Sequence, residues 1–126
     1  MRSAPVASAL TAVLCAAQPG AAQESGAGER LFATCQACHS LDPAKPGMAG
    51  PHLAGLSGRR IGTATGFDYS PALKAAGAQG LSWDAERLKA YLADPEAMFK
   101  GSWMSAPGLG RETDRAAVAD FLMRPR

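Results

Sequence analysis

The chain has 126 residues and a formal net charge of +2, from 13 Lys and Arg side chains against 11 Asp and Glu. A chain of this length holds one domain at most. So small a charge argues against nucleic acid as a partner, because nucleic-acid-binding domains carry a strong basic field.

The first 22 residues are predicted to form a secretory signal peptide. Arg2 gives a positive start, residues 6–17 are small and apolar, and no charge appears again before Glu24. The Gly-Ala-Ala run that ends at Ala22 suits cleavage by signal peptidase. The apolar run is too short and too rich in alanine to span a membrane stably, and its retention as an N-terminal anchor is the alternative.

Cleavage after Ala22 would leave one domain over residues 23–126, with twelve basic and eleven acidic side chains and a net charge of +1. Cys15 would be lost with the signal. Lipid attachment at Cys15 is a less favoured alternative, because Leu14 stands where a small residue is needed. We expect no stable membrane insertion after cleavage.

Two helices are expected before residue 80. Apolar or small side chains three and four residues apart predict a helix over 28–37. A shorter helix is predicted over 70–76, with Ser70 as its cap and Pro71 in the first turn, where the missing N–H is harmless.

Two further helices are expected toward the C-terminus. Ser82 is the predicted cap of a helix over 83–93, which Pro95 ends because the residue before a proline resists helical angles. Its expected buried stripe is Trp83, Leu88, Tyr91 and Leu92. The last helix is predicted over 112–123, before Pro125, with an inward face of Val118, Phe121 and Leu122. The pattern therefore indicates an all-α fold of four or five helices.

The segments 41–66 and 95–110 between these helices are long and rich in Gly and Pro. Irregular segments of this length are uncommon in a compact domain unless they serve a site. Something other than regular secondary structure must therefore organise them.

The sequence Cys35-Gln36-Ala37-Cys38-His39 is the strongest chemical signal in the chain. It has the C-x-x-C-H pattern of haem attachment. Two thiols three residues apart can form thioethers with the two vinyl groups on one side of a porphyrin, which brings His39 over the iron. One ring nitrogen then ligates iron, and the other is expected to donate to a backbone carbonyl. The motif predicts one covalently attached haem c per chain.

Two other readings of the cysteines fit less well. A thioredoxin-like redox pair would need a strand–turn–helix context, and the sequence around the motif does not have one. A zinc site would need two more ligands, and His52 is the one further His or Cys after the expected cleavage point.

Further motifs accompany the attachment site along the chain. They are Gly28 to Phe32, Gly50 to Arg59, Gly66 to Ser70, Gly80 to Trp83, and Tyr91 to Pro95 followed nine residues later by a methionine. With them, residues 28–123 resemble the class I c-type cytochromes, near cytochrome c2 and mitochondrial cytochrome c. The resemblance implies the cytochrome c fold wrapped around one haem, and an electron-transfer protein with no catalytic residues rather than an enzyme.

An electron carrier needs a ligand on the second face of its iron. After the expected cleavage point the chain has four methionines: Met48, Met98, Met104 and Met123. The last of these is more typical of packing, and the first follows His39 by only nine residues, a tight span for reaching the opposite face. The resemblance selects Met104, because residues 101–104 are similar to the family's Gly-Thr-Lys-Met. Met98 and His52 remain alternatives.

The resemblance also implies the surroundings of the haem. Pro51 is similar to the residue whose carbonyl accepts a hydrogen bond from His39. A set of three is similar to the residues that hydrogen-bond one haem propionate, a role that suits donors and a cation: Arg59, Tyr69 and Trp83. Tyr91 is similar to a tyrosine that packs near the methionine sulfur. Ordinary packing or solvated charge is the alternative for each.

Some residues depart from the family pattern. Lys100 stands where a proline is frequent, Trp103 where a lysine is usual, Ala106 where a phenylalanine is usual, and Leu73 where an asparagine is common. Each is expected to affect the potential or the ease of losing Met104. The close crossing of the first and last helices is expected at Gly28, Phe32 and Phe121.

Together these observations predict a soluble, monomeric carrier with a signal peptide, which passes single electrons between membrane or periplasmic redox proteins, as in a respiratory chain. Three alternatives stay open at this point. One is a haem c subunit of a larger oxidoreductase, such as a thiosulfate-oxidising or alcohol-dehydrogenase system. Another is a haem sensor or enzyme with an open iron site, and the last is a haem-free disulfide module.

Overall fold

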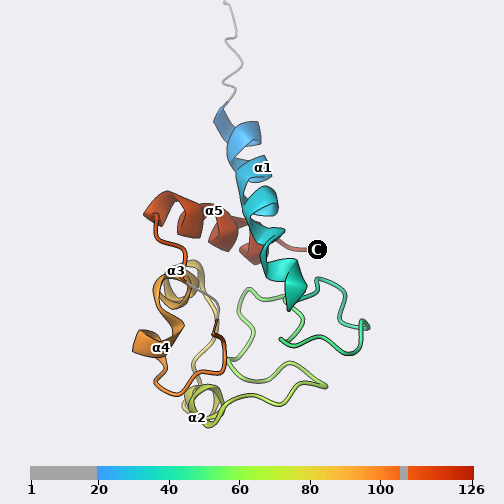
Figure 1. Cartoon of the computed structure of the whole chain (residues 1–126), viewed down its shortest axis with the longest axis vertical. Coiled ribbons are helices and arrows are strands. Elements are labelled where there is room, and N and C mark those ends of the chain that lie inside the picture. Colours follow the sequence, from blue (N-terminus) through green and yellow to red (C-terminus); the bar gives the residue numbers. More distant parts are fainter. Residues whose placement is uncertain (1–19, 106–107) are drawn as a thin grey trace, which may run out of the picture.

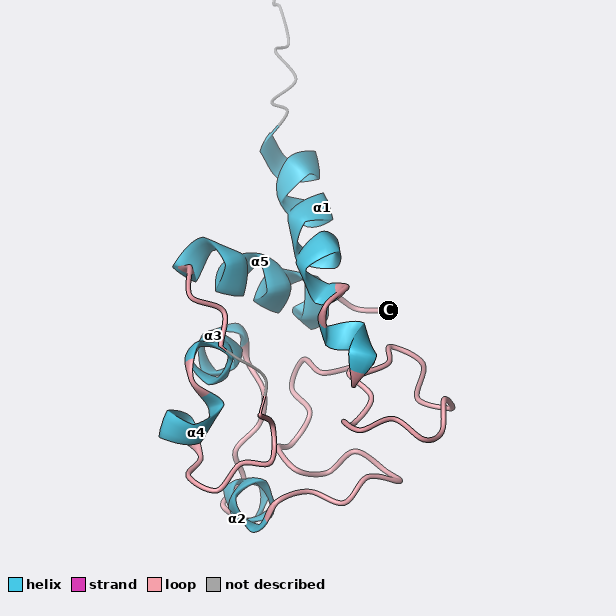
Figure 2. Ribbon diagram, in the orientation of Figure 1, coloured by secondary structure: helices cyan, strands magenta, loops and turns pink. Residues whose placement is uncertain are grey.

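The computed structural model describes residues 20–105 and 108–126 (Figure 1). Its elements are α1 (Gly20–Phe32), the 3₁₀ turn η1 (Cys35–Ala37), α2 (Pro71–Ala78), α3 (Ala85–Ala93), α4 (Pro95–Met98) and α5 (Glu112–Met123). Within the described residues there is no strand beyond an isolated bridge between Arg60 and Ser82 (Figure 2). The expectation of an all-α fold is confirmed. None of the helices in the described ranges is long and apolar enough to cross a membrane.

The helix expected over 28–37 is divided into two elements. The α-helical part, α1, begins at Gly20 and ends at Phe32, so it includes the expected cleavage point after Ala22. Bonds from Ala33 N–H to the Arg30 carbonyl and from Thr34 N–H to the Leu31 carbonyl then tighten the chain, and the motif begins in η1. Residues 1–19, most of the predicted signal, lie outside the described residues.

The two middle helices begin differently from one another. Ser70 caps α2 as predicted, because its Oγ accepts from the Leu73 N–H at 3.3 Å, and the helix extends to Ala78. The prediction that Ser82 caps α3 is wrong. Asp84 is the cap, with Oδ1 accepting from the Arg87 N–H at 2.7 Å.

Pairing with a distant segment explains this shift in the start of α3. Ser82 is bridged to Arg60, and the Trp83 N–H donates to the Arg59 carbonyl at 2.9 Å. These contacts keep residues 82 and 83 extended, so that Asp84 is the first side chain able to cap the helix. Of the expected stripe, Leu88, Tyr91 and Leu92 are buried on α3, whereas Trp83 is buried but precedes the helix.

The N- and C-terminal helices cross closely (Figure 1). A Cβ added at Gly28 would collide with the Ala117 carbonyl oxygen and lie 2.7 Å from Cβ of Phe121. The rings of Phe32 and Phe121 meet at 5.4 Å, as expected at this crossing. Val118 is fully buried, whereas Phe121 is half-buried, with the Arg126 guanidinium 4.2 Å from the centre of its ring.

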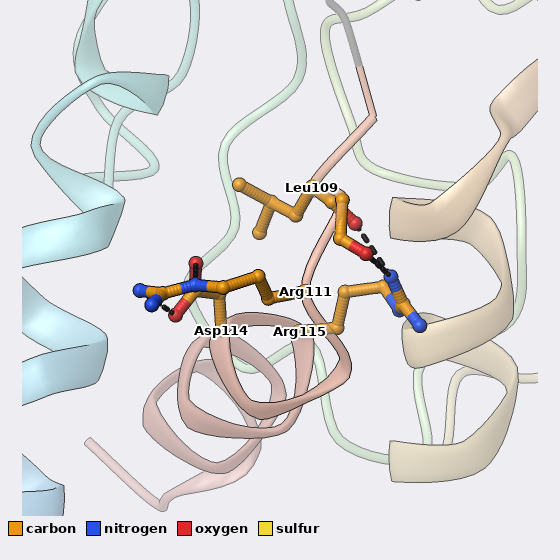
Figure 3. A network of polar contacts seen from close by, with 5 residues as sticks. Leu109, Arg111, Asp114 and Arg115 are labelled. Atoms are coloured by element: carbon orange, nitrogen blue, oxygen red, sulfur yellow. Dashed lines mark hydrogen bonds and ion pairs between the residues drawn. The ribbon is translucent and has the colours of Figure 1, made fainter.

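A polar network connects α5 to the chain before it (Figure 3). Arg111 and Asp114 form an ion pair at 2.9 Å in the first turn of the helix. The Arg115 guanidinium donates to the carbonyls of Leu109, at 2.6 Å, and Gly110, at 2.9 Å. Since the Leu109 N–H donates in turn to the Leu92 carbonyl at 2.8 Å, the segment that follows Met104 is anchored to both α3 and α5.

Candidate haem-binding site

The two motif cysteines lie on η1 and at its C-terminal cap. Both are free thiols; Cys35 is half-buried and Cys38 is exposed. The N–H groups of Cys38 and His39 both donate to the Cys35 carbonyl, at 3.1 and 2.9 Å, so that one tight turn carries both thiols and the imidazole. Burial raises the pKa of the Cys35 thiol, against the opposing effect of a hydrogen bond with Thr34.

The His39 ring is held by the segment that follows the motif. Its Nδ1 lies 2.8 Å from the carbonyl oxygen of Pro51. A carbonyl accepts only, so Nδ1 carries the proton and the lone pair stays on Nε2, the tautomer that a metal ligand needs. A Cβ at Gly50 would lie 2.7 Å from Nδ1, so only a glycine lets the backbone run so close to the ring. The Gly50 N–H donates to the Cys38 carbonyl at 2.8 Å and completes this cradle.

Met104 is half-buried against the hydrophobic core, on the segment after α4. Ser102 joins this segment to α3, because its Oγ lies 2.9 Å from the Tyr91 hydroxyl. The Tyr91 ring is buried, with its centre 5.2 Å from that of Trp83 and 5.9 Å from that of Phe99. Burial raises the pKa of the Tyr91 hydroxyl, which therefore stays protonated at neutral pH.

Trp103 and Ala106 are two departures from the family pattern that lie near Met104 in the sequence. Trp103 is 61% exposed, so its indole does not fold back into the core. Ala106 lies outside the described residues. Leu73, a departure elsewhere in the chain, is buried in the core.

Tyr69 and Trp83 are buried in the core, and Arg59 is half-buried. The Arg59 carbonyl accepts from the Trp83 N–H at 2.9 Å. The Tyr69 hydroxyl accepts from the Ala64 N–H at 3.2 Å, which leaves its own proton to donate. Burial raises the pKa of Tyr69, and the positive charge of Arg59 reduces that rise. Burial also lowers the pKa of Arg59.

The sequence did not predict that His52 contacts Arg59. This histidine, an alternative iron ligand in the sequence, lies half-buried in a loop and contacts Arg59 through both its ring and its carbonyl. No periodic pattern predicts this contact, because it lies within one irregular segment.

The residues described above have the chemistry that a covalently attached haem needs. Two free thiols stand beside an imidazole whose tautomer is set, with a glycine cradle against the ring. The half-buried thioether of Met104 suits an axial ligand of iron. The hydroxyl proton of Tyr69 and the guanidinium of Arg59 suit a propionate.

Comparison with known proteins decides the family. The family model described as Cytochrome c matches residues 25–124. The chain belongs to the cytochrome c family. It is 51% identical to cytochrome c2 of Rhodopseudomonas palustris, with 79% of this chain and 96% of that protein covered. It is 37% identical to cytochrome c-554 of Methylosinus trichosporium, with 95% and 86% covered.

A solved structure agrees with this assignment. Cytochrome c2 from Rhodospirillum centenum matches with a TM-score of 0.71 at 37% identity, over 78% of this chain and 94% of that one. The predicted cytochrome c fold is thereby confirmed, as is the resemblance to class I c-type cytochromes. This cytochrome carries covalently attached haem c and is an electron-transfer protein rather than an enzyme. The roles of individual residues at the haem remain predictions.

Proposed function

We propose that this cytochrome is a soluble, monomeric carrier that passes single electrons between redox proteins in the periplasm. One haem c is attached through Cys35 and Cys38, with His39 and Met104 as the axial ligands. When bound, the haem supplies one-electron exchange between ferric and ferrous iron. The observation that carries the proposal is the hydrogen bond from His39 to Pro51, next to two free thiols.

The His39 side provides a rigid ligand. The bond from Nδ1 to the Pro51 carbonyl holds the ring orientation and raises the basicity of Nε2. Gly50 and the backbone bond from its N–H to Cys38 keep the accepting segment in place. A ligand that is oriented before and after electron transfer keeps the structural change between the two oxidation states small.

The Met104 side provides a soft ligand and excludes water. A thioether stabilises the reduced iron and raises the potential. Tyr91 and Ser102 tie the segment of Met104 to α3, and the Phe99 ring packs against Tyr91. Such a closed site suits a carrier, which must not bind oxygen or small ligands. Arg59, Tyr69 and Trp83 are proposed to receive a propionate, with the Tyr69 proton as one donor.

The surface suits brief encounters with partners and weak electrostatic steering. A basic docking face would draw on six residues: Lys45, Arg59, Arg60, Lys74, Lys89 and Lys100. Of these, Lys74 pairs with Asp68 at 2.5 Å and Lys89 with Glu86 at 2.6 Å. Arg59 is half-buried and donates to two backbone carbonyls, so it does not belong to an exposed docking face. In the described parts of the chain the remaining three form no ion pair: Lys45, Arg60 and Lys100. We therefore expect electron-transfer rates to decline only mildly with ionic strength.

Carbon monoxide tests the closed site. The reduced, haem-loaded wild type is expected to resist carbon monoxide, whereas Met104→Ala should bind it readily, as followed by the visible spectrum. Met98→Ala is the matched control, because Met98 is also a half-buried methionine packed on the core, and it should resist as the wild type does. Ready binding by the wild type would instead indicate an open-site sensor or enzyme subunit.

A further inference from the structure

A tight turn lies between α4 and Met104. The Ser102 N–H donates to the Phe99 carbonyl at 2.9 Å, which closes a four-residue turn over 99–102. Gly101, at its third position, has φ +86°, and no residue other than glycine has positive φ in the described parts of the chain. Positive φ at the third position together with negative φ at the second defines a type II turn.

The second position of this turn lacks its usual restraint. Type II turns favour proline there, because the ring sets the required φ before folding. Here the second position is Lys100, which is exposed. The unfolded or opened segment therefore has more conformations than a proline would allow, and the closed turn needs stabilisation from elsewhere.

Glu96 supplies such stabilisation. Both of its carboxylate oxygens lie 3.0 Å from the Gly101 nitrogen, so that the Gly101 N–H donates to the carboxylate. Bonds from an N–H to a charged acceptor are stronger than neutral ones. Glu96 is in the first turn of α4, which is capped in turn by Asp94 through a 2.9 Å bond from the Ala97 N–H.

We propose that Glu96 is a positioning residue for Met104. Its carboxylate holds the N–H of Gly101, three residues before Met104, and so favours the closed turn. The alternative is an open segment, from which Met104 leaves the iron. The inference rests on the proposed role of Met104 as axial ligand. It assigns to Glu96 the restraint that the missing proline would otherwise provide.

Binding of imidazole to the ferric, haem-loaded protein measures this opening, because imidazole occupies the iron only when Met104 has left. We expect Glu96→Ala to bind imidazole about three- to fivefold more tightly than the wild type, the factor that corresponds to loss of one solvent-exposed hydrogen bond. Glu96→Gln keeps an acceptor oxygen and should restore most of the wild-type affinity. The visible spectrum that reports the sulfur–iron bond follows the same titration.

Two further variants separate the turn from general effects. Glu86→Ala removes another exposed carboxylate, which pairs with Lys89 on α3, and should leave imidazole affinity unchanged. Lys100→Pro in the Glu96→Ala background should return the affinity toward wild type. The backbone suits this proline, because Phe99 is not helical (φ −132°, ψ 88°), the φ of Lys100 is negative, and the Lys100 N–H makes no backbone hydrogen bond within the described ranges.

The inference is overturned if Glu96→Ala binds imidazole as the wild type does, if Glu86→Ala reproduces its effect, or if the proline fails to reverse it. Met104→Ala distinguishes this failure from failure of the proposed function. If Met104→Ala binds imidazole far more tightly than the wild type while Glu96→Ala does not change, only the role of Glu96 is wrong. If Met104→Ala binds no more tightly than the wild type, Met104 is not the ligand and both proposals fail.

Discussion

Arg59 is joined to His52 at two points. Nη2 of Arg59 donates to the His52 carbonyl oxygen at 2.9 Å, and Nη1 lies 3.4 Å from Nδ1 of the imidazole. Nη1 also donates to the Ala54 carbonyl at 3.1 Å. The guanidinium thus closes the loop of residues 52–59 on itself and places a permanent positive charge beside a histidine.

This contact makes stability depend on pH. Burial, followed by the charge of Arg59, lowers the pKa of His52 below its ordinary value of 6.5. The unfolded chain therefore binds a proton more readily than the folded one as the pH falls below 6.5, and the free energy of unfolding decreases in that range. His52→Asn should reduce the decrease between pH 7.5 and 5, measured by denaturant unfolding of the haem-loaded protein. An equal decrease in both proteins would show that His52 does not contribute.

The hydroxyl of Tyr69 should contribute both to stability and to the potential. Tyr69→Phe leaves the Ala64 N–H without its acceptor, at a cost of about 1–3 kcal/mol. If the hydroxyl also donates to a propionate, its loss leaves more negative charge near the iron and lowers the reduction potential. Denaturant unfolding and a redox titration measure the two effects. A variant that loses stability but keeps its potential would remove Tyr69 from the propionate site.

The crossing of α1 and α5 should tolerate no side chain at Gly28. A Cβ there collides with the Ala117 carbonyl, so Gly28→Ala should destabilise the protein by about 1–3 kcal/mol through overpacking. Gly26→Ala is the matched control on the same helix, because its Cβ meets only the far end of the Arg30 side chain at 3.0 Å. It should be neutral or stabilising by about 0.5–1 kcal/mol, as alanine is in a helix interior. Equal melting temperatures for the two variants would contradict the close crossing.

Export should remove the N-terminal segment. We expect protein from the periplasmic fraction to begin at Gln23, as measured by intact mass of the haem-loaded chain. Ala22→Arg places a large charged side chain at the expected cleavage point, where signal peptidase needs a small one. That variant should keep residues 1–22 and accumulate at the membrane. Mature wild-type protein that retains these residues would instead support an anchor.

Local patterns in the sequence were enough to predict the haem attachment site and several helix ends. The C-x-x-C-H motif predicted the haem because its chemistry needs only five consecutive residues. The bounds of α5 were predicted correctly, and so was the Ser70 cap of α2. In each case the deciding interactions join residues fewer than five positions apart. Such interactions depend on spacing that can be read directly from the chain.

Contacts between distant segments were decided by the tertiary structure. Asp84 rather than Ser82 caps α3 because residues 82 and 83 pair with Arg60 and Arg59. The contact of Arg59 with His52 likewise depends on how an irregular loop closes, which no periodic pattern describes. Hydrogen-bond partners of this kind exist only once packing has brought the segments together, and the geometry around His39 and Met104 depends on that packing as well.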